Sequence, residues 1–166
     1  MKSVVDVIMV LLSIAVVSSS SIFYVNASAN DLEDMVNVYM NFGASSSNPD
    51  EYNCSKWVAL FTNNGTAHAP GAPPASGSKE LNEDCEMTRK LFKHLTAYSK
   101  EILPVTDGDS KKLSRVAFNW EIVGILAPPS PGTAVHVPAI TTWEMDPTGT
   151  KILHAIDYFD PSPLSV

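Results

Sequence analysis

The side chain in this 166-residue chain best placed to transfer a proton is Asp157. It lies in a strand-like stretch, residues 152–160, whose alternation places Ala155, Asp157 and Phe159 on one face. A carboxylate on a face that packs against apolar side chains loses water, which raises its pKa toward neutrality and suits a general acid or base. The alternative is a structural role, in which Asp157 pairs with the first-helix backbone or with Tyr39, or a bulge turns it outward.

Two further side chains could share this chemistry. Tyr39, in the first predicted helix, could donate a hydrogen bond to a substrate. His68 lies in a short predicted strand, where strict alternation points it away from the pocket, toward a surface or rim position; a catalytic role requires a rim bulge that turns it inward. No metal-ligand spacing, phosphate-binding glycine loop or nucleophile elbow occurs, so we predict no metal and no cofactor.

Hydrophobic periodicity predicts the elements that position these residues. Helices are expected over residues 30–42, from Asn48 to a stop at Asn63-Asn64-Gly65, and over residues 78–98. A short strand over residues 66–70 and a loop over residues 71–77 separate the last two helices. The remaining predicted strands, of which the first is the weakest, cover residues 102–106, 113–126, 133–145 and 152–160.

This order of elements indicates an α+β fold. We expect three N-terminal helices on the concave face of a curved antiparallel sheet, around a cone-shaped cavity. Aromatic side chains at alternating strand positions could equally form a plain core. The predicted lining, besides Tyr39 and Asp157, is Leu60, Phe118, Trp120, Thr141, Trp143 and Phe159.

The N-terminus and the overall charge predict where the protein works. Lys2, an apolar run over residues 7–17 and the small-residue site Ala27-Ser28-Ala29 are typical of a signal peptide over residues 1–29, which leaves a mature domain over residues 30–166. The run is too short to span a bilayer, so we expect a secreted protein without a membrane anchor. A net charge of −7 disfavours nucleic-acid binding.

Because we expect the protein to be secreted, we also expect its cysteines and N-x-S/T sequons to be modified. Cys54 and Cys85 are expected to form one disulfide, the alternative being two buried thiols. Asn53 and Asn64 begin N-x-S/T sequons, and Asn64, in a predicted turn, is the better glycosylation candidate; Asn26 would leave with the signal peptide.

Residues 57–70, WVALFTNNGTAHAP, resemble the helix-to-strand segment of the nuclear transport factor 2-like superfamily, which includes ketosteroid isomerases and SnoaL-type cyclases. Residues 77–81, 120–124 and 151–159 resemble its later landmarks. The resemblance implies the fold described above and dimerisation through the outer sheet face. It also implies a catalytic Asp where this chain has Ala69 and an oxyanion-hole Asp where it has Thr141, so steroid isomerisation is not expected.

Two functions remain. The first is a cofactor-independent cyclase, isomerase or dehydratase that acts on a small hydrophobic substrate, with Asp157 as the acid or base. The alternative is a non-catalytic module of the same fold that binds a small hydrophobic ligand or dimerises.

Overall fold

The computed structural model describes residues 29–40, 53–109, 111–127 and 132–164. The predicted signal peptide, apart from Ala29, and the predicted second-helix start at Asn48 lie outside these ranges. The described helices are α2 (Ala29–Met40), α3 (Cys54–Val58), α4 (Gly77–Leu91) and the 3-10 helix η2 (Ser162–Leu164). The strands are β1 (Phe61–His68), β2 (Ala75–Ser76), β3 (Phe92–Thr106), β4 (Leu113–Leu126), β5 (Ala134–Met145) and β6 (Ile152–Tyr158).

The six strands form one curved sheet in the order β2-β1-β6-β5-β4-β3. The long strands β3 to β6 pair as antiparallel neighbours, as their spacing predicts. β1 pairs in parallel with β6, so the sheet is mixed and the prediction of a wholly antiparallel sheet is wrong. Strand periodicity carries no information about this pairing, because no hairpin joins β1 to β6.

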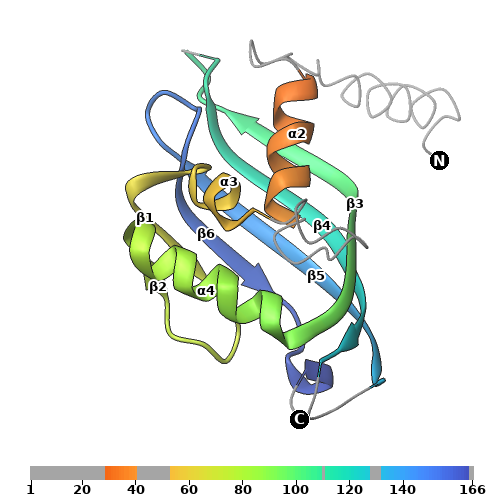
Figure 1. Ribbon diagram of the computed structural model, residues 1–166. Helices are drawn as coiled ribbons and strands as arrows, with labels where there is room; N and C mark the ends of the chain where they lie inside the picture. The colour runs from red at the N-terminus through yellow and green to blue at the C-terminus, as the bar shows by residue number, and fades with distance from the viewer. Residues whose placement is uncertain (1–28, 41–52, 110, 128–131, 165–166) are drawn as a thin grey trace, which may run out of the picture.

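The helices lie on one face of the sheet, which bends around them (Figure 1). The strand faces that meet them carry the predicted alternation: Val116, Phe118, Trp120 and Ile122 of β4 are all buried. Burying side chains of this size stabilises the fold by about 1.5–3 kcal/mol each. The core therefore lies between this face of the sheet and the helices.

The helix predicted over residues 78–98 ends earlier, at Leu91. The chain continues directly as β3, which absorbs the weak strand predicted over residues 102–106. Phe92 and Leu95 have helical spacing, but a register shift between Phe92 and His94 lets both point into the core from a strand. The backbone of β4 also needs a long hydrogen-bonded partner, and this tertiary pairing overrides local periodicity.

The second predicted helix is also shorter than expected. α3 ends at Val58 and β1 begins at Phe61, so Asn64 and Gly65 lie within a strand and do not end a helix. The register of β1 against β6 shifts between Phe61 and Thr66, and a Cβ on Gly65 would lie only 2.9 Å from that of Phe61. Gly65 thus serves an irregular strand in close contact with its neighbour.

The remaining strands differ only slightly from the predicted ranges. The strand predicted over residues 66–70 is the end of β1, and the loop predicted over residues 71–77 contains β2, which pairs with β1. β5 and β6 occupy the predicted stretches with slightly narrower bounds.

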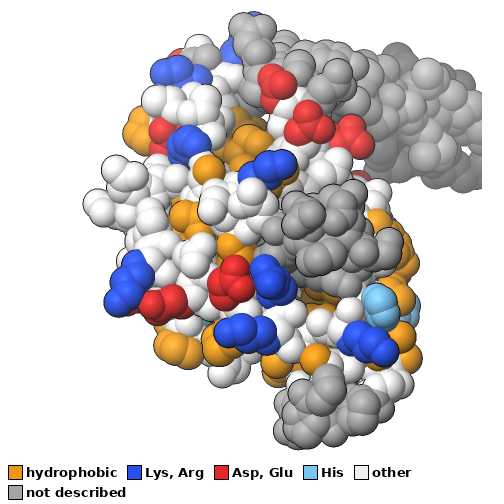
Figure 2. All heavy atoms as spheres, in the orientation of Figure 1, with side chains coloured by type: hydrophobic (Ala, Val, Ile, Leu, Met, Phe, Trp, Pro, Cys, Tyr) orange, Lys and Arg blue, Asp and Glu red, His pale blue; other side chains and the backbone are white. Residues whose placement is uncertain are grey.

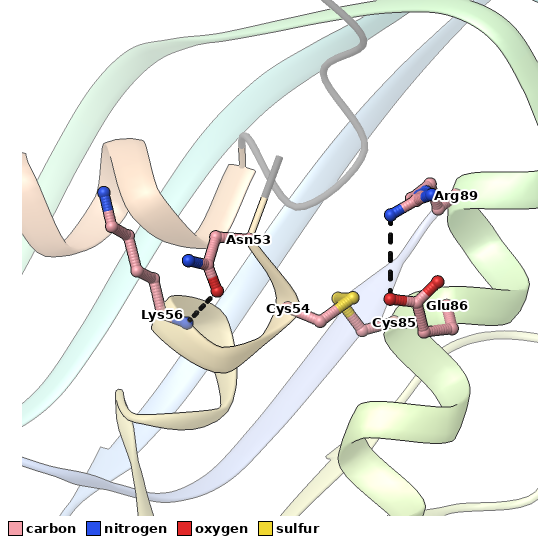
Figure 3. Close-up of a disulfide and its surroundings, with 6 residues drawn as sticks. All are labelled: Asn53, Cys54, Lys56, Cys85, Glu86 and Arg89. Atoms are coloured by element: carbon pink, nitrogen blue, oxygen red, sulfur yellow. Dashed lines mark hydrogen bonds and ion pairs between the residues drawn. A yellow bond between two sulfur atoms is a disulfide. The ribbon is translucent and has the colours of Figure 1, made fainter. Parts of the chain in front are cut away.

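A disulfide joins Cys54 of α3 to Cys85 of α4, as expected from the sequence. The two side chains turn toward each other from neighbouring helices (Figure 3). Asn53 caps α3, because its side chain accepts a hydrogen bond from the backbone N–H of Lys56 at 3.2 Å. With only five residues, α3 depends on this cap and on the disulfide.

Candidate functional site

A pocket of about 370 Å³ lies between the helices and the sheet. The loop after β1, one face of α4, the start of β3 and the C-terminal segment surround it. Its wall is largely apolar, and the polar exceptions are Thr88 and four titratable residues: Tyr39, His68, Asp84 and Asp157. A mostly apolar cavity with a few convergent polar groups is typical of small-molecule sites.

The carboxylate of Asp157 is anchored by two hydroxyl groups. Tyr39 donates to Oδ1 at 3.1 Å, and Thr141 donates to the same oxygen at 2.6 Å. An ionised carboxylate can only accept, so Thr141 donates its hydroxyl proton to Asp157, while Thr141 Oγ1 accepts a hydrogen bond from the Nε1–H of Trp120 at 2.9 Å. Oδ2 receives no hydrogen bond from the described residues, which leaves it for a ligand.

Burial raises the pKa of Asp157 from its ordinary value of 3.8 to about 6. The hydrogen bonds from Thr141 and Tyr39 oppose this rise, the negative charge of Asp84 adds to it, and His68 lowers it. Burial and the adjacent Asp157 also raise the pKa of Tyr39 well above its ordinary value, so the phenol keeps its proton. Asp157 thus exchanges a proton near neutral pH while Tyr39 stays a donor.

One titratable pocket residue, Asp84, was not predicted from the sequence. Asp84 lies on the face of α4 formed by residues 84, 87, 88 and 91, all of which line the pocket. It is half-buried, and this burial raises its pKa. Asp84 lies three residues after Leu81 and four before Thr88, a spacing that places all three on one side of the predicted helix and could have revealed it.

The structure separates the predicted lining into two groups. Trp120 and Phe159 line the pocket together with Tyr39, His68 and Asp157. The others (Leu60, Phe118, Thr141 and Trp143) are not among its lining residues.

Tyr39 explains this separation. Its ring makes edge contacts with Phe118 and Trp143, at centroid distances of 5.9 and 5.2 Å, and all three rings are buried. The alternation of residues along a strand shows which face of the sheet a side chain occupies. Whether that side chain then lines the cavity or is covered by a helix depends on tertiary packing. Thr141 still acts on the site through Asp157.

The Thr141 hydroxyl offers a direct test of this arrangement. Thr141→Val should raise the pKa of Asp157 by about one unit, because the carboxylate loses a charge-assisted hydrogen bond. It should also lower the free energy of unfolding by about 1–3 kcal/mol, since Trp120 Nε1 loses its acceptor.

Carboxyl-carbon NMR titration measures the pKa, and urea unfolding measures the stability. Thr142→Val is the matched control, because Thr142 is the next residue of β5 and its side chain points to the opposite face. An unchanged Asp157 titration in Thr141→Val would contradict the role assigned to this hydroxyl.

Three further findings bear on the site and its surroundings. Among the described residues, no three His, Cys, Asp or Glu side chains are grouped so that they could hold a metal ion. Both predicted glycosylation sites that the structure describes, Asn53 and Asn64, are exposed. No helix within the described ranges is long and apolar enough to cross a membrane.

A curved mixed sheet with helices on its concave face and a pocket between them defines a class of α+β proteins built around one ligand-sized cavity. Solved structures show which class this is. A hypothetical protein with a ketosteroid isomerase-like fold from Catenulispora acidiphila, in complex with trimethylamine, superposes with a TM-score of 0.60 at 16% identity, over 79% of this chain and 88% of its own.

Two more structures agree. The epoxide hydrolase/cyclase-like enzyme SalBIII, which has a role in pyran ring formation in the polyether salinomycin, gives a TM-score of 0.58 at 18% identity, over 81% of this chain and 94% of its own. A phenazine biosynthesis-related protein from Pseudomonas aeruginosa gives a TM-score of 0.59 at 17% identity, over 80% of this chain and 84% of its own.

The chain therefore has the nuclear transport factor 2-like, or ketosteroid isomerase-like, fold. No protein-family model matches the sequence, and no curated protein matches it significantly.

Proposed function

We propose that this protein is a cofactor-independent lyase, isomerase or cyclase that acts on a small hydrophobic substrate, with Asp157 as its general base. The observation that carries the proposal is the state of this carboxylate: it lies in an apolar pocket, its Oδ1 is anchored by two hydroxyls, and its pKa is raised to about 6. Enzymes of the same fold carry out related chemistry, as the cyclase-like SalBIII illustrates.

The proposed step is abstraction of a proton from a bound substrate by Oδ2 of Asp157. At pH 7 most of this carboxylate is ionised, yet its raised pKa makes it a stronger base than an exposed aspartate. Tyr39 and Thr141 hold Oδ1 in place, and after the transfer they stabilise the anchored carboxyl group. The position that resembles the ketosteroid isomerase base is Ala69, so this pocket draws its base from a different strand.

His68 is the candidate for a second proton transfer. It lines the same pocket, and its charge acts on Asp157. In a dehydration, His68 would protonate the departing hydroxyl, whereas in a simple isomerisation Asp157 could return the proton itself. His68→Gln would therefore separate these two reactions once a substrate is known.

A general probe tests the base without that knowledge. A base that removes the C3 proton of 5-nitrobenzisoxazole breaks the N–O bond and releases a coloured cyanophenolate. The protein should accelerate this ring opening above the buffer rate, with a rate that rises with pH through one inflection near pH 6, because only the carboxylate form of Asp157 accepts a proton. A flat profile across that pH, or no acceleration, would argue against the base.

One observation favours the alternative of binding without chemistry. Oδ1 of Asp157 is already saturated by Tyr39 and Thr141, which is also what a purely structural carboxylate would show. A protein that binds hydrophobic small molecules in a thermal-shift screen, yet leaves the ring-opening probe at the buffer rate, would be a binding module.

We also propose that the mature chain is secreted, glycosylated and dimeric. The disulfide suits an oxidising compartment, and the N-terminal residue of the exported product should be Asn30. Asn53 and Asn64 would carry glycans, detectable as a loss of mass after enzymatic deglycosylation.

The dimer would form through the outer sheet face, where Ile140, Ile156 and Tyr158 are exposed by 52, 37 and 52%. Light scattering should then give twice the mass of the chain, and Ile140→Glu should give the monomer.

A further inference from the structure

The pocket carries negative charge without a matching cation. Asp84 and Asp157 both line it, and neither lysine nor arginine is among its lining residues. The segments after residue 28 that the structure does not describe contain no lysine, arginine or histidine in their sequence. Among the described residues that line the pocket, His68 is therefore the one basic side chain beside the two carboxylates.

Asp84 differs from the other acidic residues of α4. Glu83 forms an ion pair with Lys79, with 3.8 Å between Oε1 and Nζ, and Glu86 forms one with Arg89, with 3.7 Å between Oε1 and Nη1. Solvent reaches the side chains of both pairs. Asp84 makes no hydrogen bond or ion pair with any described residue, although it is half-buried in the pocket. Burying a carboxylate without a partner costs free energy, which a cationic ligand would recover.

The rest of the wall suits an organic cation. Aromatic side chains from five elements or segments surround the cavity: Tyr39, Trp57, Phe92, Trp120 and Phe159. The faces of such rings attract ammonium groups, most strongly where water is excluded. A metal cation has a weaker claim, because no group of three suitable ligands is found among the described residues.

We propose that the ligand of this pocket is a small protonated amine with an apolar, ring-bearing body, whose ammonium group pairs with Asp84. The aromatic wall holds the body of the ligand, and Oδ2 of Asp157 remains free to act on it. This inference rests on the proposed function, since it names the substrate class of the same site. The cavity of about 370 Å³ is at the small end of ligand pockets, which limits the body to one or two rings.

Calorimetric binding of two matched probes tests the proposal. 2-Phenylethylammonium and the neutral 2-phenylethanol have similar shapes and differ in the charged group. The wild-type protein should bind the ammonium at least tenfold more tightly. Asp84→Asn should remove this preference while keeping the shape of the side chain, and Glu83→Gln, which removes an exposed charge from the same helix, should retain it.

Equal affinity of the wild type for the two probes, or no binding of either at millimolar concentration, would overturn the proposal without any variant. Loss of the preference in Glu83→Gln would also overturn it, because the effect would then be one of overall charge. The ring-opening assay uses a neutral probe and no amine, so its outcome is independent: a protein can fail either test and pass the other.

Discussion

Asp157→Asn should lower the rate of 5-nitrobenzisoxazole ring opening by a factor of about 10²–10⁴, the usual contribution of one general base. The amide cannot accept the proton at neutral pH, so the loss should appear in the chemical step. The inflection near pH 6 should vanish together with the rate, because the group that titrates there is gone.

The same variant should remain folded. The amide oxygen of asparagine can accept the hydrogen bonds from Tyr39 and Thr141 that Oδ1 accepts in the wild type. Because folding raises the pKa of Asp157, ionising this side chain in the folded protein costs free energy. The wild type is therefore less stable above a pH of about 6 than below it, and a neutral asparagine avoids that loss. Thermal unfolding at pH 7 should thus occur at or above the wild-type temperature.

Asp109→Asn is the matched control, since Asp109 is exposed in the turn between β3 and β4. It should leave both the rate and the pH profile unchanged. If Asp157→Asn retained the wild-type rate while folded, Asp157 would have the structural role, and the binding function would be the better account of the pocket.

Removal of the disulfide should have the largest effect on stability. The double variant Cys54→Ala, Cys85→Ala should lose about 3–4 kcal/mol of unfolding free energy, because the bond restricts an unfolded loop that spans 31 residues. For a domain of this size the melting temperature should fall on the order of 10 °C. Alanine is preferred to serine, since both cysteines are buried and a hydroxyl would lack partners.

The effect should extend to the pocket. Cys85 adjoins Asp84 on α4, and the disulfide is a covalent tie between that helix and the short α3 (Figure 3). Loosening α4 would displace the pocket face at residues 84, 87, 88 and 91, so probe binding should weaken together with stability.

Dithiothreitol provides the control for this experiment. It should destabilise the wild type and leave the alanine double variant unchanged. Equal melting temperatures of oxidised wild type and double variant would contradict the stabilising role of the bond.

The charge distribution agrees with a small-molecule function. On the face that carries the helices, basic and acidic side chains intermingle and do not gather into a basic patch (Figure 2). Together with the net charge of −7, this gives no support for a nucleic-acid partner.

Much of the fold could be predicted from the sequence where the signal was local. The alternation of Val116, Phe118, Trp120 and Ile122 predicted a half-buried strand, because strand side chains point to opposite faces in turn. The position of Asp157 on the inward face of the last strand followed from the same rule. The two cysteines predicted their own pairing, since no other partner exists in the chain.

Other features depended on contacts between distant segments. Residues 92–98 have helical spacing yet join a strand, because β4 requires a hydrogen-bonded neighbour along its length. The parallel pairing of β1 with β6 depends on how the chain returns to the sheet, which no local pattern records.

The pocket itself was decided by the tertiary structure alone. Tyr39 packs against Phe118 and Trp143, which do not line the pocket, whereas Trp120 and Phe159 do. The sequence determined that Asp157 would face inward. Only packing determined that two hydroxyls would hold it there and that a second carboxylate, Asp84, would share its cavity, because both facts depend on where α2 and α4 come to rest on the sheet.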